Sequence, residues 1–291
     1  MRDDSARGGL TGTLAKVTRW GAARAGELRE RLPFITRLTR QMVDVSLLDS
    51  STRLAAQAFL TAVPVLFVVA AFAPSAVRDR LVESATYALG LSGAALAQVQ
   101  QVFAAPDDTT RDTSGAVGVL VTLLSATSCS RALQRVCERS WHVPPAGLRL
   151  IAWRWLVWLL VWLAALVVQG LLHDGFGLGR WLGLLLSFVS STLLWWWTQH
   201  LLLGSRVGWL PLLPGAVLTG TGVVALAWAS RFYLPRTLNR SVNEFGPLGL
   251  VFTLLSWLIA LFTVVCVGIA TGYVLAHEPP LARRLGTPPP G

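Results

Sequence analysis

The chain has 291 residues, of which 53% are hydrophobic and 14% charged, with a formal net charge of +10. Soluble domains usually carry about 25% charged residues, so this composition excludes an ordinary soluble domain and indicates a membrane protein. The next question is whether the apolar residues gather in stretches long enough to cross a bilayer.

Six apolar segments meet that requirement, because a hydrocarbon core of about 30 Å needs roughly 20 helical residues. The predicted spans are residues 53–73, 114–134, 151–172, 181–203, 209–230 and 247–276. They predict an all-α fold, a polytopic six-transmembrane-helix bundle whose membrane domain covers residues 47–277. Between the first two spans, residues 75–113 are predicted to form an amphipathic helical excursion.

The basic residues predict the orientation of this bundle, because short loops rich in Lys and Arg stay in the cytoplasm. If the N-terminus is inside, the inner segments carry 18 of the 25 Lys and Arg residues and the outer segments carry 7. Both termini are therefore predicted to be cytoplasmic, in the plasma (inner) membrane of a bacterium. Since the basic residues gather at membrane borders, no nucleic-acid partner is expected.

Two tails flank the membrane domain. Residues 1–46 form a basic tail, in which residues 10–32 have the spacing of an amphipathic helix that ends at Pro33. Such a helix would lie on anionic lipid, although a solvated tail explains the pattern almost as well. Residues 278–291 form a proline-rich tail, and both tails are predicted to be cytoplasmic.

The first span contains a proline and an amide inside an apolar run. Pro64 removes a backbone hydrogen bond and should kink the helix. Three alanines at positions 55, 58 and 62 form a small stripe that lets another helix approach closely. Gln57 should face this stripe or a cavity, and we predict that it contributes to substrate binding.

Three arginines follow the second span at regular spacing. Arg131, Arg135 and Arg139 repeat every four residues and so share one face of a helix. Anchoring to the cytoplasmic side explains positive charge at this border. Alternatively this face binds an anionic substrate, for which Arg131 and Arg135 are the candidates.

Prolines and glycines mark the last two spans. Proline near the start of a helix costs least, because its missing N–H has no helical partner there. A GxxxG pair at Gly268 and Gly272 is typical of helix contacts in membranes. Structural hinges are predicted at Pro64, Pro214, Gly215, Gly246 and Pro247.

The loop between these two spans is predicted to lie outside, yet it carries positive charge, which is usually found on the cytoplasmic side. Arg231, Arg236 and Arg240 precede Asn243 and Glu244. Arginine pairs bidentately with phosphate, so these five residues are candidates for holding an anionic lipid headgroup or polymer. Ordinary headgroup contact with an Arg–Glu pair explains them as well. Asn243 or Glu244 could also cap the helix that begins at Pro247.

The sequence does not favour an enzyme. The four histidines are scattered at span ends without ligand spacing, so no metal, cofactor or catalytic residue is expected. The six spans contain no Asp or Glu, which argues against a proton relay of carboxylates. The three cysteines form no spaced framework and should be buried and free of disulfides.

The pattern resembles the BrkB/YihY family of bacterial inner-membrane proteins. Four stretches carry the resemblance in family order: AQAFLTAVPVLFVVAAFAP (56–74), SGAVGVLVTLLSATSCSRALQRVCERSWHV (114–143), VGWLPLLPGAVLTG (207–220) and NEFGPLGLVFTLLSWLIALFTVVCVG (243–268). The chain departs from the family at Phe59-Leu60, where an aromatic pair is more frequent. It also has Gly272 and Tyr273 where a glutamate often stands, so any role of that carboxylate is not transferred.

The resemblance implies six helices with both ends inside and a role at the cell envelope. We hypothesise that the protein moves, or helps to move, an anionic amphipathic envelope molecule through a cleft between spans one and five. The alternative is a non-transporting scaffold that recruits partners or anionic lipid through its basic tail. The expected partners are anionic membrane lipids, and a homo-oligomer is left open.

Overall fold

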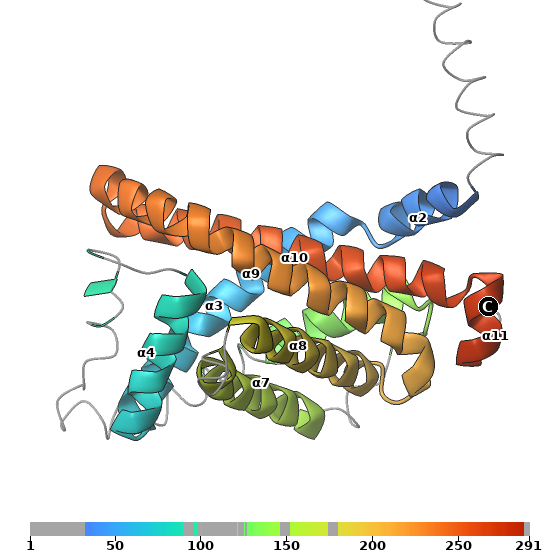
Figure 1. The fold of residues 1–291 in the computed structure, drawn as a ribbon, viewed down its shortest axis with the longest axis horizontal. Coiled ribbons are helices and arrows are strands. Elements are labelled where there is room, and N and C mark those ends of the chain that lie inside the picture. The colour runs from blue at the N-terminus through green and yellow to red at the C-terminus, as the bar shows by residue number, and fades with distance from the viewer. Residues whose placement is uncertain are drawn as a thin grey trace, which may run out of the picture.

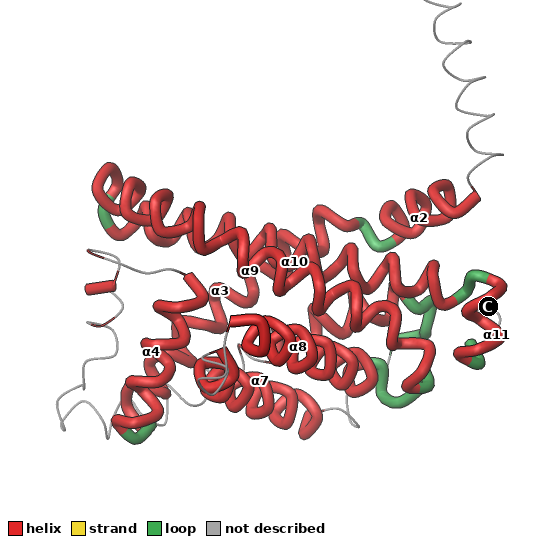
Figure 2. Tube along the Cα trace, in the orientation of Figure 1, coloured by secondary structure: helices red, strands yellow, loops and turns green. Residues whose placement is uncertain are grey.

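The computed structural model describes residues 33–89, 127–145, 152–173 and 180–287, and single residues at 93, 96, 97, 100, 121 and 125. The described residues are mostly helical, with short loops and turns between the helices and no strand (Figure 2). The helices are α2 (Pro33–Asp44), α3 (Leu47–Phe72), α4 (Ser75–Leu89), α7 (Ala152–His173), α8 (Arg180–Leu202), α9 (Trp209–Phe245), α10 (Pro247–Ala276) and α11 (Pro279–Leu285). Residues 127–140 are also helical, and we call them the arginine helix.

The central feature is an antiparallel hairpin of the two longest helices, α9 and α10, which run side by side across the molecule (Figure 1). The 37 residues of α9 extend about 55 Å at 1.5 Å per residue. We call the end where α9 begins and α10 finishes the proximal end, and the turn at Gly246 the distal end. The proximal end is marked by Trp141, whose ring meets the ring of Tyr273 edge-on at 5.4 Å.

Small residues bring the two hairpin helices into close contact. A Cβ added at Gly272 would lie 2.2 Å from the Cα of Gly215, and one at Gly268 would lie 2.9 Å from the Cα of Thr219. These separations are too short for any side chain, so the GxxxG pair forms a backbone contact between α9 and α10. The predicted helix-contact role of Gly268 and Gly272 is confirmed.

The other helices pack on this hairpin in order. α8 packs on α9, α7 on α8, and α3 on α10. α10 therefore packs against both α3 and α9. The cleft expected between spans one and five stays a prediction. The amphipathic α2 lies against α10, and α4 packs on α7 and α9.

The predicted spans agree with the helices in part. The last span coincides with α10, whereas α9 continues 15 residues beyond the predicted end at 230. Residues 231–245, predicted as a loop, are therefore helical, and that prediction is wrong. Within the described residues, α9 and α10 are the helices long and apolar enough to cross a membrane. The amphipathic helix predicted at residues 10–32 lies outside the described residues, and Pro33 begins α2.

Candidate functional site

The arginine helix has one charged face and one buried face. Arg131, Arg135 and Arg139 are exposed, as their spacing of four residues predicts. The residues between them are buried, including Leu133 and Cys137, which are at most 1% exposed. Cys137 is fully buried, and burial raises the pKa of its thiol, which disfavours the reactive thiolate form.

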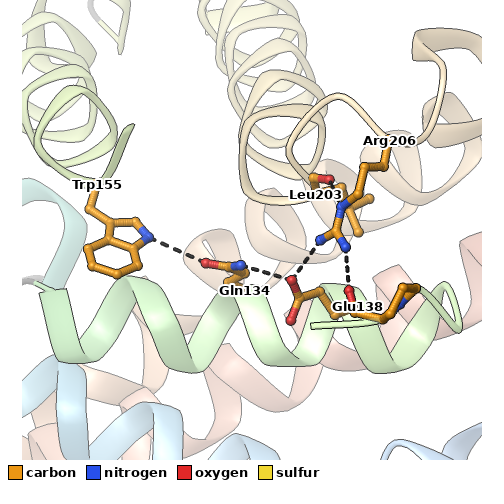
Figure 3. Close-up of polar contacts among 6 residues, drawn as sticks. Gln134, Glu138, Trp155, Leu203 and Arg206 are labelled. Carbon is orange, nitrogen blue, oxygen red and sulfur yellow. Dashed lines mark hydrogen bonds and ion pairs between the residues drawn. The ribbon is translucent and has the colours of Figure 1, made fainter. Parts of the chain in front are cut away.

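A polar network on the buried face of the arginine helix holds this helix in place (Figure 3). The side-chain amide of Gln134 donates to Glu138 Oε1 at 2.8 Å, and Arg206 Nη2 pairs with the same oxygen at 2.7 Å. Trp155 Nε1 on α7 donates to Gln134 Oε1 at 3.4 Å. The network therefore joins the arginine helix to α7 and to the loop between α8 and α9.

Arg206 uses the rest of its guanidinium on backbone carbonyls. Its Nε donates to the carbonyl oxygen of Leu203 at 2.7 Å, and its Nη1 donates to that of Pro144. The Glu138 side chain is only 7% exposed. A buried charge pair of this kind is strongly destabilised when one partner is removed, because the other charge stays buried without compensation.

A small, open groove lies between the first turns of α3 and the arginine helix. Its lining residues are Asp49, Ser50, Arg53, Leu54, Ala132, Arg135, Val136 and Arg139. The lining thus contains three arginines and one carboxylate. Arg53 Nη2 lies 3.6 Å from Asp49 Oδ2, and both side chains are more than half exposed. We call this feature the cationic groove.

The positive charge of the cationic groove is not neutralised by the described residues. Arg135 and Arg139 form no ion pair with any of them. Arg131 lies apart, because its guanidinium carbon sits over the ring of Trp155, 4.6 Å from the centroid. Of the two predicted substrate-binding arginines on this helix, Arg135 lines the groove and Arg131 does not.

The distal candidates lie along the last turns of α9 and do not form a single site. Arg240 Nε pairs with Glu244 Oε1 at 2.8 Å, as an exposed pair one turn apart. Arg236 Nη1 donates to the carbonyl oxygen of Phe232 at 2.7 Å. Arg231 is partly buried, whereas Arg236 and Arg240 are exposed, so the three arginines do not converge on one mouth.

The predicted cap of the last helix is corrected by the turn between α9 and α10. Asn243 and Glu244 belong to the last turn of α9, and the N-cap of α10 is Gly246, which makes no side-chain cap. Gly246 has φ of 61°, a left-handed conformation that favours glycine, and Pro247 follows at the first helical position as predicted.

The remaining candidates lie inside helices. Pro64 and Pro214 are interior residues of α3 and α9, and neither helix is divided there. Gly215 contacts Gly272 and faces the Gln199 amide, whose oxygen would lie 3.0 Å from an added Cβ. Gln57 Oε1 is buried without a hydrogen-bond partner among the described residues.

Sequence reasoning missed two features of the proximal end. Arg53 joins the cationic groove from α3, about eighty positions away in sequence from Arg135, and no local pattern indicates this contact. The Glu138–Arg206 pair was also missed, although Gln134 and Glu138 have the one-turn spacing of a buried polar face. The three cysteines are buried and free, as predicted.

Comparison with known proteins gave one family. A family model described as Virulence factor BrkB matches residues 38–288. Comparisons with curated proteins and with solved structures gave no match. The family match covers most of the chain and confirms the resemblance seen in the sequence.

Proposed function

The chain belongs to the BrkB family and is accordingly an integral membrane protein. We propose that it moves, or helps to move, an anionic amphipathic envelope molecule between leaflets. The proposed setting is the bacterial plasma membrane, crossed six times with both termini in the cytoplasm. The activity involves no bond making or breaking, so the protein is not an enzyme in this proposal.

The apolar outer surface of the bundle supports the multi-pass topology. Leu160 on α7 and Leu185 and Leu193 on α8 are each more than half exposed. Large aliphatic side chains in such positions suit a lipid environment and would be costly in water. α7 and α8 are therefore proposed as spans alongside α9 and α10.

The observation that carries the proposal is the presence of exposed arginines at both ends of the α9–α10 hairpin. The arginine helix lies at the proximal end, where Trp141 contacts Tyr273. Arg236 and Arg240 lie near the distal end. Guanidinium groups at both membrane borders would attract a phosphate-bearing molecule to either leaflet.

Unpaired polar groups inside the bundle support a path between these ends. Thr192 Oγ1, Thr219 Oγ1 and both amide atoms of Gln199 are buried without hydrogen-bond partners among the described residues. Each unpaired group costs roughly 1–3 kcal/mol. A small opening between α8, α9 and α10 would give these groups partners, such as the headgroup of a passing molecule.

Leaflet exchange in reconstituted vesicles tests the proposal. We expect purified full-length protein to accelerate exchange of a fluorescent phosphatidylglycerol over protein-free vesicles and over vesicles that hold an unrelated six-span protein. Rates equal to those of both controls across a panel of anionic lipids would contradict the proposed function.

The scaffold alternative is favoured by the surface of α2. Ile35 and Val43 on this amphipathic helix are 52% and 70% exposed, which leaves an apolar face for a membrane or a partner. Deletion of residues 1–45, which removes the basic tail together with α2, separates the two functions. A scaffold that acts through its basic tail would lose its cellular phenotype, whereas a transporter would retain leaflet exchange.

A further inference from the structure

We propose that the cationic groove binds the phosphate of an anionic glycerophospholipid, held by Arg53, Arg135 and Arg139. This inference deepens the proposed function, since it names the class of molecule and places its headgroup at the proximal end. It rests on the charge, the lining and the fixed geometry of the groove.

The charge of the groove favours a phosphate. Arg53, Arg135 and Arg139 line it together with a single carboxylate, Asp49. Within the described part of the chain, Asp49 pairs with Arg53, at 3.6 Å, in a solvent-exposed pair that contributes little. Arg135 and Arg139 form no ion pair among the described residues, so their donors remain available for an anion that accepts several hydrogen bonds.

An exposed leucine at the start of α3 favours a lipid over a free phosphate ion. Leu48 precedes the lining residue Asp49 in the chain and is 72% exposed. The apolar residues of the groove itself, Leu54, Ala132 and Val136, are each at most 4% exposed and offer little surface to a ligand. A molecule with a phosphate and an adjoining apolar part matches both the arginines and Leu48, whereas inorganic phosphate matches only the arginines.

The two walls of the groove are held in place before any ligand binds. Ser50 Oγ on α3 donates to the carbonyl oxygen of Val45 at 2.8 Å, and Thr61 Oγ1 donates to the carbonyl oxygen of Ser125 at 3.0 Å. The network of Glu138 and Arg206 fixes the arginine helix from its buried side. A site held in this way loses little conformational entropy on binding.

Lipid counting on the detergent-solubilised full chain tests this inference without any transport step. Native mass spectrometry would follow binding of dioctanoyl phosphatidylglycerol, dioctanoyl phosphatidylcholine and inorganic phosphate. The groove variant is Arg135→Gln/Arg139→Gln. The matched control is Arg283→Gln/Arg284→Gln, two exposed arginines on α11 that do not line the groove.

We expect one tightly bound phosphatidylglycerol, with affinity reduced about tenfold or more in the groove variant, as loss of charge-assisted hydrogen bonds predicts. The control should stay within about twofold, and Arg135→Lys/Arg139→Lys should recover part of the affinity through charge alone. Binding should also weaken with added salt. Equal losses in the groove and control variants would overturn the inference.

Two further outcomes would overturn it. Equal affinity for phosphatidylcholine would show that the groove does not select anionic headgroups. Equally tight binding of inorganic phosphate would show that the groove does not select a lipid. Because binding is measured without vesicles, site-specific binding together with absent leaflet exchange would contradict the proposed function and leave this inference standing. If the groove variant loses lipid binding but keeps leaflet exchange, the groove binds a lipid and the transported molecule passes through another part of the protein.

Discussion

At the scale of single residues, Arg206 holds the proximal end together. It is one side chain in a short loop, yet it pairs with Glu138 of the arginine helix and with two backbone carbonyls. The two partners differ in exposure, since the Arg206 side chain is 29% exposed and that of Glu138 is 7% exposed. Their removal should therefore have unequal effects on stability.

Arg206→Ala should lower the free energy of unfolding by roughly 3 kcal/mol, because it leaves the Glu138 carboxylate buried and uncompensated. Glu138→Gln should cost less, since the freed guanidinium can reach water and the new amide can still bond Gln134. Thermal unfolding in detergent would measure both. Arg240→Gln, which breaks an exposed pair, is the control and should cause no measurable change. Equal losses in all three variants would contradict this account.

Gln199 is a second residue of interest, because its buried polar side chain should destabilise the folded protein. Its amide is fully buried and has no hydrogen-bond partner among the described residues. Gln199→Leu should therefore leave the melting temperature unchanged or raise it, because an unpaired buried amide is replaced by an apolar side chain. Under the proposed function the same variant should exchange lipid more slowly. A lower melting temperature with unchanged exchange would show that Gln199 is a structural residue only.

At the scale of elements, the α9–α10 contact depends on the absence of side chains. Gly272→Ala should destabilise the hairpin by about 1–3 kcal/mol, because the new Cβ would meet the Gly215 backbone at 2.2 Å. Gly208→Ala is the control, since its Cβ would meet only Pro211 Cδ at an ordinary 3.6 Å. Denaturation by SDS in mixed micelles would compare them. Similar curves for the two variants would contradict the contact.

Much of the helical order could be predicted from sequence, because the physical signals were local. The bounds of α10 follow from Gly246, which breaks the helix, and Pro247, which begins the next one. The arginine stripe at Arg135 and Arg139 follows from a spacing of four residues. These features depend on neighbours along the chain and need no tertiary contact.

The distal part of α9 was missed because its composition outweighed its periodicity. The polar stretch after residue 230 was predicted to be an outer loop, yet the helix continues through it and through Pro235. The reason is tertiary packing: Leu234 and Leu238 are buried against Leu250, Leu254 and Trp257. The spacing of Ser230, Leu234, Leu238 and Val242, all buried, was the available signal. The cationic groove could not be predicted, since Arg53 reaches it only through folding.

At the scale of the whole molecule, the length of α9 determines which part of this helix can lie inside the bilayer. A helix of about 55 Å exceeds a hydrocarbon core of about 30 Å. Its polar distal turns, with Arg236, Arg240 and Glu244, should therefore extend beyond the membrane on one side. The cationic groove, at the other end of the hairpin, should then lie on the opposite side.

The most direct test of the account is the sidedness of the two hairpin ends in intact cells. The three native cysteines are buried, so single cysteines introduced at exposed positions can be labelled selectively. The account predicts that Asn243→Cys reacts with a membrane-impermeant maleimide from outside, whereas Arg283→Cys reacts only after the cells are opened. Labelling of both positions from outside, or of Arg283→Cys alone, would contradict it.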